Sequence, residues 1–237
     1  MSAKMLTWAA LAATVLFGVA AYVIVPFTGY TADVLPIAQP KPAIQPAGYA
    51  FSIWGVIYLW LVASAVFGII RKAQDTAWAA ALIWLIPSLV IGAFWNWIAN
   101  QSAIWATVAI WIMLALALRA AFLAPLADRW WLKAPVALYA GWLSAASFVS
   151  LGVTLPGYGI GFDANTWAVI GICVATILAV TVQIRLGAMP TYGAAIIWAF
   201  VGILINNTTD IAPVTWVANA GIFAVVVAII LAFRRRA

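Results

Sequence analysis

The chain is divided into long apolar runs, and this pattern constrains its fold more than any other feature of the sequence. Eight such runs, most of them about 20 residues long, alternate with shorter segments that hold most of the charges and prolines. A helix needs roughly 20 mostly apolar residues to cross a bilayer. Because 68% of the residues are hydrophobic and 7% are charged, a soluble or a disordered protein is excluded. We therefore predict an all-α fold, a polytopic membrane helix bundle of about eight transmembrane helices.

The breaks in hydropathy place the expected helices along the chain. The predicted spans are Met5–Val25, Phe51–Ile70, Trp78–Ala99, Ala103–Leu123, Ala134–Leu155, Thr166–Ile184, Tyr192–Ile205 and Val214–Phe233. The seventh is the shortest. The longest connection, residues 26–50, holds five prolines, which remove backbone donors and fix φ, so we expect a loop there. Long loops in compact proteins often serve as lids or binding segments.

The basic residues indicate how the bundle is oriented. If the N-terminus is cytoplasmic, eight spans place every one of the 11 basic residues except Lys41 on the cytoplasmic side. Lys and Arg are enriched in cytoplasmic loops, so we predict that both termini are cytoplasmic. The layout suits an integral protein of a bacterial inner membrane. The net charge of +6 is then explained by orientation in the lipid bilayer, and no nucleic-acid partner is expected.

Missing residue types exclude several kinds of chemistry. The chain has no His and no Glu, and its single cysteine is Cys173. Imidazole-based catalysis, His-ligated haem and cysteine metal clusters are therefore excluded, and no metal or covalent cofactor is expected. No charged residue sits clearly at a span centre, which argues against an ion-coupled transporter.

The 15 tryptophans allow two interpretations. Rings near span ends, such as Trp8 and Trp216, fit an aromatic belt at the headgroup level. Rings inside spans, such as Trp54 and Trp142, fit either packing within the bundle or a pocket for a flat ligand.

Three segments together resemble a known family. The proline-rich loop leads into QPAGYAFSIWGVIY (residues 45–58), Trp95-Asn96-Trp97 follows in the third span, and PLADRWWLKAPVALYAGWLSAA (residues 125–146) enters the fifth. These runs resemble the TspO/translocator-protein family of tryptophan-rich sensory proteins, with Pro46, Phe51, Trp54 and Tyr58 matching its signature. Since the family core has five helices, the resemblance implies a TspO-like core over residues 1–155, with its long first loop at 26–50. Residues 156–237 would then add three transmembrane helices and a basic C-terminus.

The resemblance also implies a function. Family members bind porphyrins or sterol-like molecules in a tryptophan-lined pocket under the first loop, as sensors, regulators or carriers, and are often homodimers. The implied pocket tryptophans are Trp54 and Trp142. The other implied ligand-binding residues are Tyr49, Phe51, Tyr58, Asn96, Trp97 and Ala146. Some members are reported to degrade protoporphyrin in light, which needs no acid–base residue, so catalysis stays open.

The chemistry of the residues is compatible with a porphyrin ligand. Indole faces stack on flat aromatic systems, and Lys41 in the loop offers a charge to a propionate, although a solvated loop lysine is the simpler interpretation. Without a His ligand, a free-base porphyrin fits better than haem. Two other functions stay open. One is a structural or assembly subunit of a larger membrane complex, and the other is a small-molecule transporter, with Pro87 in the third span and Pro190 before the seventh.

Overall fold

The computed structural model describes residues 2–24, 30, 34–207 and 212–234. These residues form eight α-helices and one 3₁₀ turn, η1 (Gly48–Ser52). The helices are α1 (Ala3–Val23), α2 (Ile53–Arg71), α3 (Thr76–Gln101), α4 (Ala103–Leu123), α5 (Lys133–Gly157), α6 (Ala164–Leu186), α7 (Pro190–Asn206) and α8 (Ala212–Arg234). The all-α prediction is confirmed, and each predicted span corresponds to one helix.

Short polar residues start several of the helices where the apolar runs begin. Asp75 accepts hydrogen bonds from the first backbone N–H groups of α3, and Asp163 does the same for α6. Ser102 separates α3 from α4 and caps α4 through the N–H of Trp105. Such N-caps satisfy donors that have no partner within the helix. They explain why a single extended residue is enough to turn the chain between α3 and α4.

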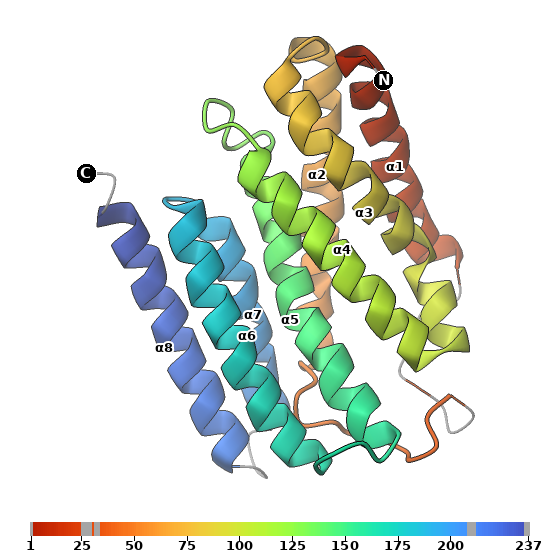
Figure 1. Cartoon of the computed structure of the whole chain (residues 1–237), viewed down its shortest axis with the longest axis vertical. Helices are drawn as coiled ribbons and strands as arrows, with labels where there is room; N and C mark the ends of the chain where they lie inside the picture. Colours follow the sequence, from red (N-terminus) through yellow and green to blue (C-terminus); the bar gives the residue numbers. More distant parts are fainter. Residues whose placement is uncertain (1, 25–29, 31–33, 208–211, 235–237) are drawn as a thin grey trace.

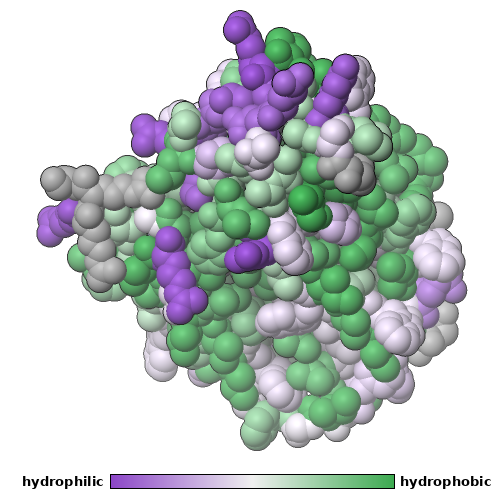
Figure 2. Space-filling view, turned by 45° about the horizontal axis from the view of Figure 1, so that its top comes forward, coloured by the Kyte–Doolittle hydropathy of each residue, from purple (hydrophilic) through white to green (hydrophobic). Residues whose placement is uncertain are grey.

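The helices are suited to a membrane by length and by surface. Seven of those in the described part of the chain are long and apolar enough to cross a bilayer. The eighth, α7, has 17 residues, which is at the short end of the range for a spanning helix. In Figure 2, hydrophilic side chains gather at one end of the molecule, and apolar side chains cover most of the remaining visible surface. These features define a polytopic helical membrane protein that contacts the lipid bilayer.

Helix α5 is the centre of the bundle. Figure 1 shows it between α1–α4 on one side and α6–α8 on the other. In its most apolar window 83% of the residues are buried, against 28–50% in the other candidate spans. Its small residues permit this packing, as is usual where helices meet in lipid. A Cβ added at Gly141 would lie 2.2 Å from the Tyr192 carbonyl oxygen of α7, so α5 and α7 touch through their backbones.

The start of α1 and the end of α8 lie at the same end of the bundle (Figure 1). There, the turn between α2 and α3 is tied to the α4–α5 loop, since the Asp128 carboxylate lies 2.6 Å from the Lys72 ammonium and accepts a hydrogen bond from the Trp78 indole. Partial burial tends to raise the pKa of Asp128, but the hydrogen bonds from Lys72 and Trp78 and the charge of Lys72 outweigh it and lower that pKa. Arg235 and Arg236 lie outside the described residues.

At the opposite end, the predicted first loop is packed into the bundle. Residues 34–47 of this loop cross the ends of α5 and α6 and reach α7. The Leu35 and Ile44 side chains are buried against Gly157 and against Gly152 and Gly171, while the Ile37 N–H donates to the Gly157 carbonyl. The part of the loop at residues 26–29 and 31–33 lies outside the described residues. The segment that leads into η1 is therefore anchored in the bundle through Leu35 and residues 42–46, while most of residues 36–41 are exposed.

Candidate functional site

The two predicted pocket tryptophans meet between α2 and α5. The centroids of the Trp54 and Trp142 rings are 6.1 Å apart, with the planes at 82°. Tyr58 stacks on Trp54 at 5.5 Å, one helical turn further along α2, since residues four apart lie on the same helix face. Three of the predicted residues thus form one aromatic cluster.

Two further rings belong to this cluster that were absent from the predicted set. Phe17 of α1 lies edge-on to Trp54 at 5.6 Å and to Tyr58 at 5.0 Å. Tyr139 of α5 lies 5.7 Å from Phe17 and 6.3 Å from Trp54. Tyr139 could have been predicted from the sequence, because it precedes Trp142 by three residues and so shares its helix face. Phe17 could not have been predicted in this way, because its ring contacts are with residues of other helices.

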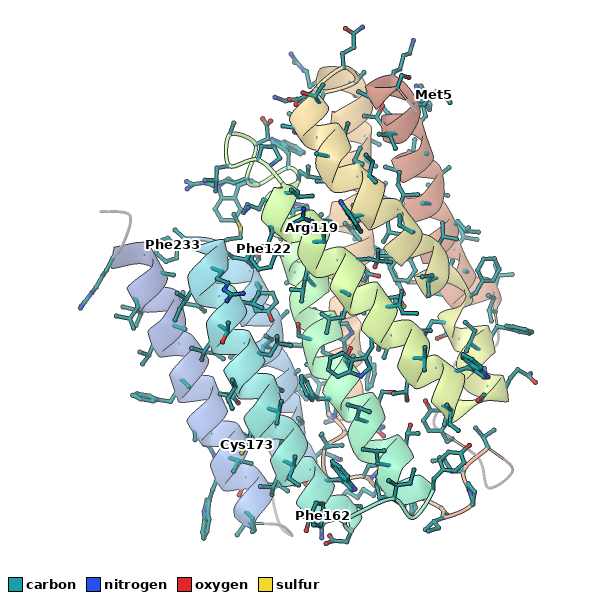
Figure 3. All side chains as sticks on the ribbon, viewed as in Figure 1. Met5, Arg119, Phe122, Phe162, Cys173 and Phe233 are labelled. Atoms are coloured by element: carbon teal, nitrogen blue, oxygen red, sulfur yellow. The ribbon has the colours of Figure 1, made fainter. Side chains whose placement is uncertain are left out.

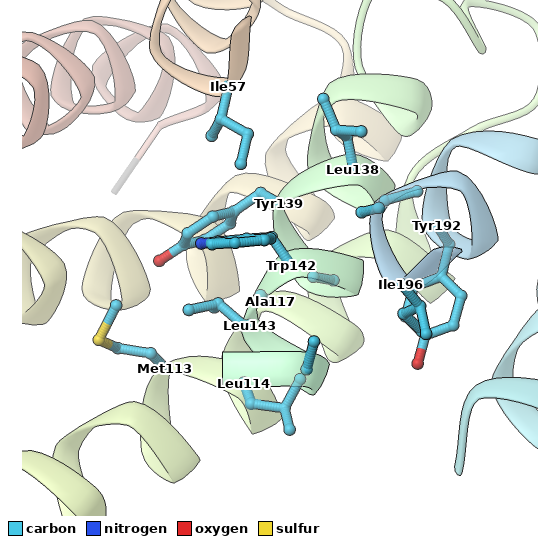
Figure 4. Close-up of a cluster of buried hydrophobic side chains, with 14 of the residues drawn as sticks. Ile57, Met113, Leu114, Ala117, Leu138, Tyr139, Trp142, Leu143, Tyr192 and Ile196 are labelled. Atoms are coloured by element: carbon cyan, nitrogen blue, oxygen red, sulfur yellow. The ribbon is translucent and has the colours of Figure 1, made fainter. Parts of the chain in front are cut away.

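A hydrogen-bond network fixes one side of the cluster. The Ser88 hydroxyl lies 3.0 Å from the Tyr139 hydroxyl and donates to the Met113 carbonyl at 2.9 Å. Ser88 follows Pro87 inside α3. Figure 4 shows Tyr139 and Trp142 side by side, surrounded by apolar side chains that include Ile57 and Leu143.

One residue of η1, Phe51, covers the cluster. Phe51 lies edge-on to Trp142 at 5.8 Å; it is 43% exposed, whereas Trp142 is 2% exposed. Tyr49 points elsewhere and lies edge-on to Trp198 of α7 at 5.4 Å. The Trp198 indole N–H donates to the Ala50 carbonyl at 2.8 Å. Phe51 is therefore the partly exposed ring over Trp142, and Trp198 is a contact to η1 that the sequence did not reveal.

The remaining predicted residues lie at the edge of this arrangement or outside it. Trp97 is 59% exposed, and among the described residues it makes no ring contact with the cluster. Asn96, its neighbour on α3, accepts a hydrogen bond from the Asn100 amide through its backbone carbonyl. Ala146 is half-buried one turn after Trp142 on α5. The structure thus brings five of the eight predicted residues, Tyr49, Phe51, Trp54, Tyr58 and Trp142, around η1 and the cluster.

The rings pack against one another. Centroid separations of 5.0–6.3 Å are those of aromatic pairs in direct contact. A small cavity lies elsewhere, between α1, α2 and α3. Its volume is about 10 Å³ and its lining includes none of the predicted ligand-binding residues. A flat ligand that binds among these rings must therefore displace some of them.

The first loop (residues 26–50), called loop one from here on, is hydrogen-bonded to α7 near η1. The Ala47 N–H donates to the Gly202 carbonyl at 2.9 Å. The Asn206 amide donates to the Gln45 carbonyl at 2.9 Å, and the Asn207 amide donates to the Ala43 carbonyl at 2.7 Å. A Cβ at Gly202 would come within 2.9 Å of both Pro46 and Ala50. The segment that carries Phe51 is thus held from one side by the C-terminal helices.

In the described part of the chain, no group of three metal-ligating side chains lies close together. The candidate site is the aromatic cluster inside the helical membrane bundle, with loop one and η1 packed at the adjacent end. The chain belongs to the TSPO-like family, whose model matches residues 4–232. The match extends from α1 to α8 and so includes the helices that follow α5. No curated protein and no solved structure matches the chain.

Proposed function

We propose that this protein binds a hydrophobic small molecule, a tetrapyrrole or a sterol-like lipid, at the aromatic cluster of Trp54 and Trp142 under loop one. The observation that carries the proposal is that these two tryptophans, far apart in the sequence, lie with their rings 6.1 Å apart. Membership of the TSPO-like family supports the same class of ligand. In this role the protein acts as a sensor, regulator or carrier.

The chemistry of the cluster suits a large apolar ligand. Indole and phenol rings contribute burial and ring contacts of about 0.5–1.5 kcal/mol per pair beyond the buried area. Because the chain has no His, the site favours a free-base porphyrin over a haem that needs an axial imidazole. Lys41 is exposed on loop one and offers a cation to a propionate group.

Ligand entry requires the cluster to open. Phe51 is the ring best placed to move, since it is partly exposed and covers the buried Trp142. For a ligand that binds only the open arrangement, the apparent affinity is the intrinsic affinity multiplied by the fraction of protein that is open.

We propose different roles for the first five helices and for the last three. Residues 1–155 form the core that supplies Phe17, Trp54, Tyr58, Tyr139 and Trp142, and residues 156–237 supply Trp198, Asn206 and Asn207, which hold loop one. We also propose that the basic end of the bundle, with both termini, faces the cytoplasm of a bacterial cell. The support for this orientation is the enrichment of Lys and Arg at that end.

Ligand-dependent thermal stability tests the proposal. Protoporphyrin IX, haem and a sterol are each added to the purified protein in detergent, and the unfolding temperature is recorded. A ligand present at 100 times its Kd stabilises the folded state by about 2.7 kcal/mol. We expect a rise in unfolding temperature with protoporphyrin IX that is absent in Trp54→Phe/Trp142→Phe. Equal rises in both proteins would contradict the site.

The size of the extracted protein separates this function from that of an assembly subunit. Native mass spectrometry in mild detergent gives the mass of the particle. A monomer or homodimer that still binds ligand supports the proposal. Co-purification of stoichiometric foreign subunits together with no ligand-dependent stabilisation would favour the assembly role.

A further inference from the structure

Arg119 is a charged residue on the outer face of an otherwise uncharged helix. It is exposed near the end of α4, and neither α3 nor α4 contains another charged side chain. Figure 3 places Arg119 and Phe122 near that end of α4. Its Cα lies four residues before the last residue of the helix, about 6 Å along the axis. The exposed side chains around it on α4 are apolar, among them Ile112 and Phe122. The guanidinium therefore lies within the membrane-spanning hairpin and close to its basic end.

The carboxylates that the structure describes all have other partners. Asp128 and Asp75 both pair with Lys72, and Asp163 caps α6. None of these three forms an ion pair with Arg119. A guanidinium at the edge of the hydrocarbon region is costly unless water or an anion reaches it.

The end of α4 does not use Arg119 either. Carbonyl groups at a helix C-terminus attract cations, but here the cation is Lys133, which is 5% exposed. Its ammonium group donates to the carbonyls of Ala121 and Ala124 at 3.0 and 2.9 Å. Lys133 thus supplies the cation at this helix end from inside the bundle, whereas Arg119 is exposed on the outer surface.

On that surface an aromatic ring holds the guanidinium. The Arg119 Cζ atom lies 5.8 Å from the centroid of the Trp84 ring on α3, and Trp84 is 38% exposed. An arginine placed over a ring keeps its in-plane N–H donors for other partners. Tryptophan is itself favoured at the headgroup level of a bilayer.

We propose that Arg119 and Trp84 form a binding site for the phosphate of an anionic phospholipid headgroup. A guanidinium binds phosphate oxygens through two parallel N–H donors, and the Trp84 ring limits the directions in which the Arg119 side chain points. Lipid is the ligand because the exposed side chains around the pair are apolar and lie where acyl chains contact the bundle. An anionic headgroup is favoured because the surrounding end of the protein is basic.

Lipid retention tests the site without reference to any porphyrin. The full-length protein is reconstituted in nanodiscs of phosphatidylcholine with increasing fractions of phosphatidylglycerol, then transferred to mild detergent. Native mass spectrometry counts the phosphatidylglycerol that stays bound. Arg119→Gln is compared with Arg185→Gln, which removes an exposed arginine in the last turn of α6 at the same end of the bundle. Trp84→Leu keeps the charge and removes the ring.

We expect wild-type protein and Arg185→Gln to retain phosphatidylglycerol in preference to phosphatidylcholine. Arg119→Gln should need about fivefold more phosphatidylglycerol for equal retention, the ratio that corresponds to about 1 kcal/mol for one cation at an anionic membrane. The amount of phosphatidylglycerol that Trp84→Leu needs for equal retention should lie between the amounts for wild type and Arg119→Gln. Equal losses in Arg119→Gln and Arg185→Gln would overturn the proposal in favour of a diffuse basic surface. Displacement of the lipid by millimolar inorganic phosphate would assign the site to a soluble anion instead.

Discussion

The side-chain amide of Asn207 donates a 2.7 Å hydrogen bond to the carbonyl of Ala43, 164 positions away in the sequence. This bond joins the end of α7 to loop one, and both residues are buried. The same amide also donates to the Ile203 carbonyl at 2.8 Å, so its orientation is fixed from within α7. The C-terminal helices therefore help to set the position of the loop that covers the aromatic cluster.

We expect Asn207→Ala to loosen loop one. Without the amide, the buried carbonyl of Ala43 loses its partner, which costs about 1–3 kcal/mol. The free energy of unfolding in detergent should fall by that amount, and amide hydrogen exchange at residues 43–50 should become faster. Asn219→Ala is the matched control, because its amide bonds only the Thr215 carbonyl of its own helix at an exposed site. Unchanged exchange at residues 43–50 in Asn207→Ala would contradict the role of this bond.

The contact between α5 and α7 predicts opposite results for two glycines. Gly141→Ala should destabilise the protein by about 1–3 kcal/mol or more, because the new methyl group would lie 2.2 Å from the Tyr192 backbone oxygen. Gly55→Ala on α2 meets nothing within 4 Å and should be neutral or stabilising by up to about 1 kcal/mol. Thermal unfolding of both variants checks this, and equal effects would show that the close approach is wrong.

The stability of the basic end should depend on pH through Asp128. Its pKa is lowered in the folded protein, so the stability it contributes is present above its ordinary pKa of 3.8 and is lost as the pH falls through the lowered value. In Asp128→Asn this contribution is absent throughout. The difference in unfolding temperature between wild type and variant should therefore shrink as the medium is acidified from neutrality. A difference that stays constant or grows would contradict the Lys72–Asp128 contact.

Much of the fold followed from the sequence because hydropathy acts locally. A spanning helix is specified by its own composition, so the eight helices, including the short seventh one, could be predicted to within two residues at each end. The meeting of Trp54 and Trp142 was accessible only through the family resemblance. That Tyr58 and Tyr139 share faces with these tryptophans follows from helical spacing alone.

The rest depended on contacts between distant segments. Nothing in the apolar run around Phe17 indicates that it fills the space between Trp54 and Tyr139. Nothing in the polar stretch after Ile205 indicates that Asn206 and Asn207 bind the loop at residues 43–45. The family resemblance therefore predicted five of the aromatic residues near loop one. The part played by Phe17, Tyr139 and Trp198, the closed packing of the rings and the attachment to α7 emerged from the structure.

The central claim is that the Trp54–Trp142 cluster binds the ligand, and tryptophan fluorescence tests it most directly. Protoporphyrin IX is titrated into wild-type protein, into Trp54→Phe/Trp142→Phe and into a control, Trp8→Phe/Trp216→Phe, whose exposed rings lie outside the cluster. We predict saturable quenching in the wild type and the control, and its loss in the cluster variant. Saturable quenching of the same affinity in the cluster variant, or linear quenching in all three that matches simple partition into detergent, would contradict the account.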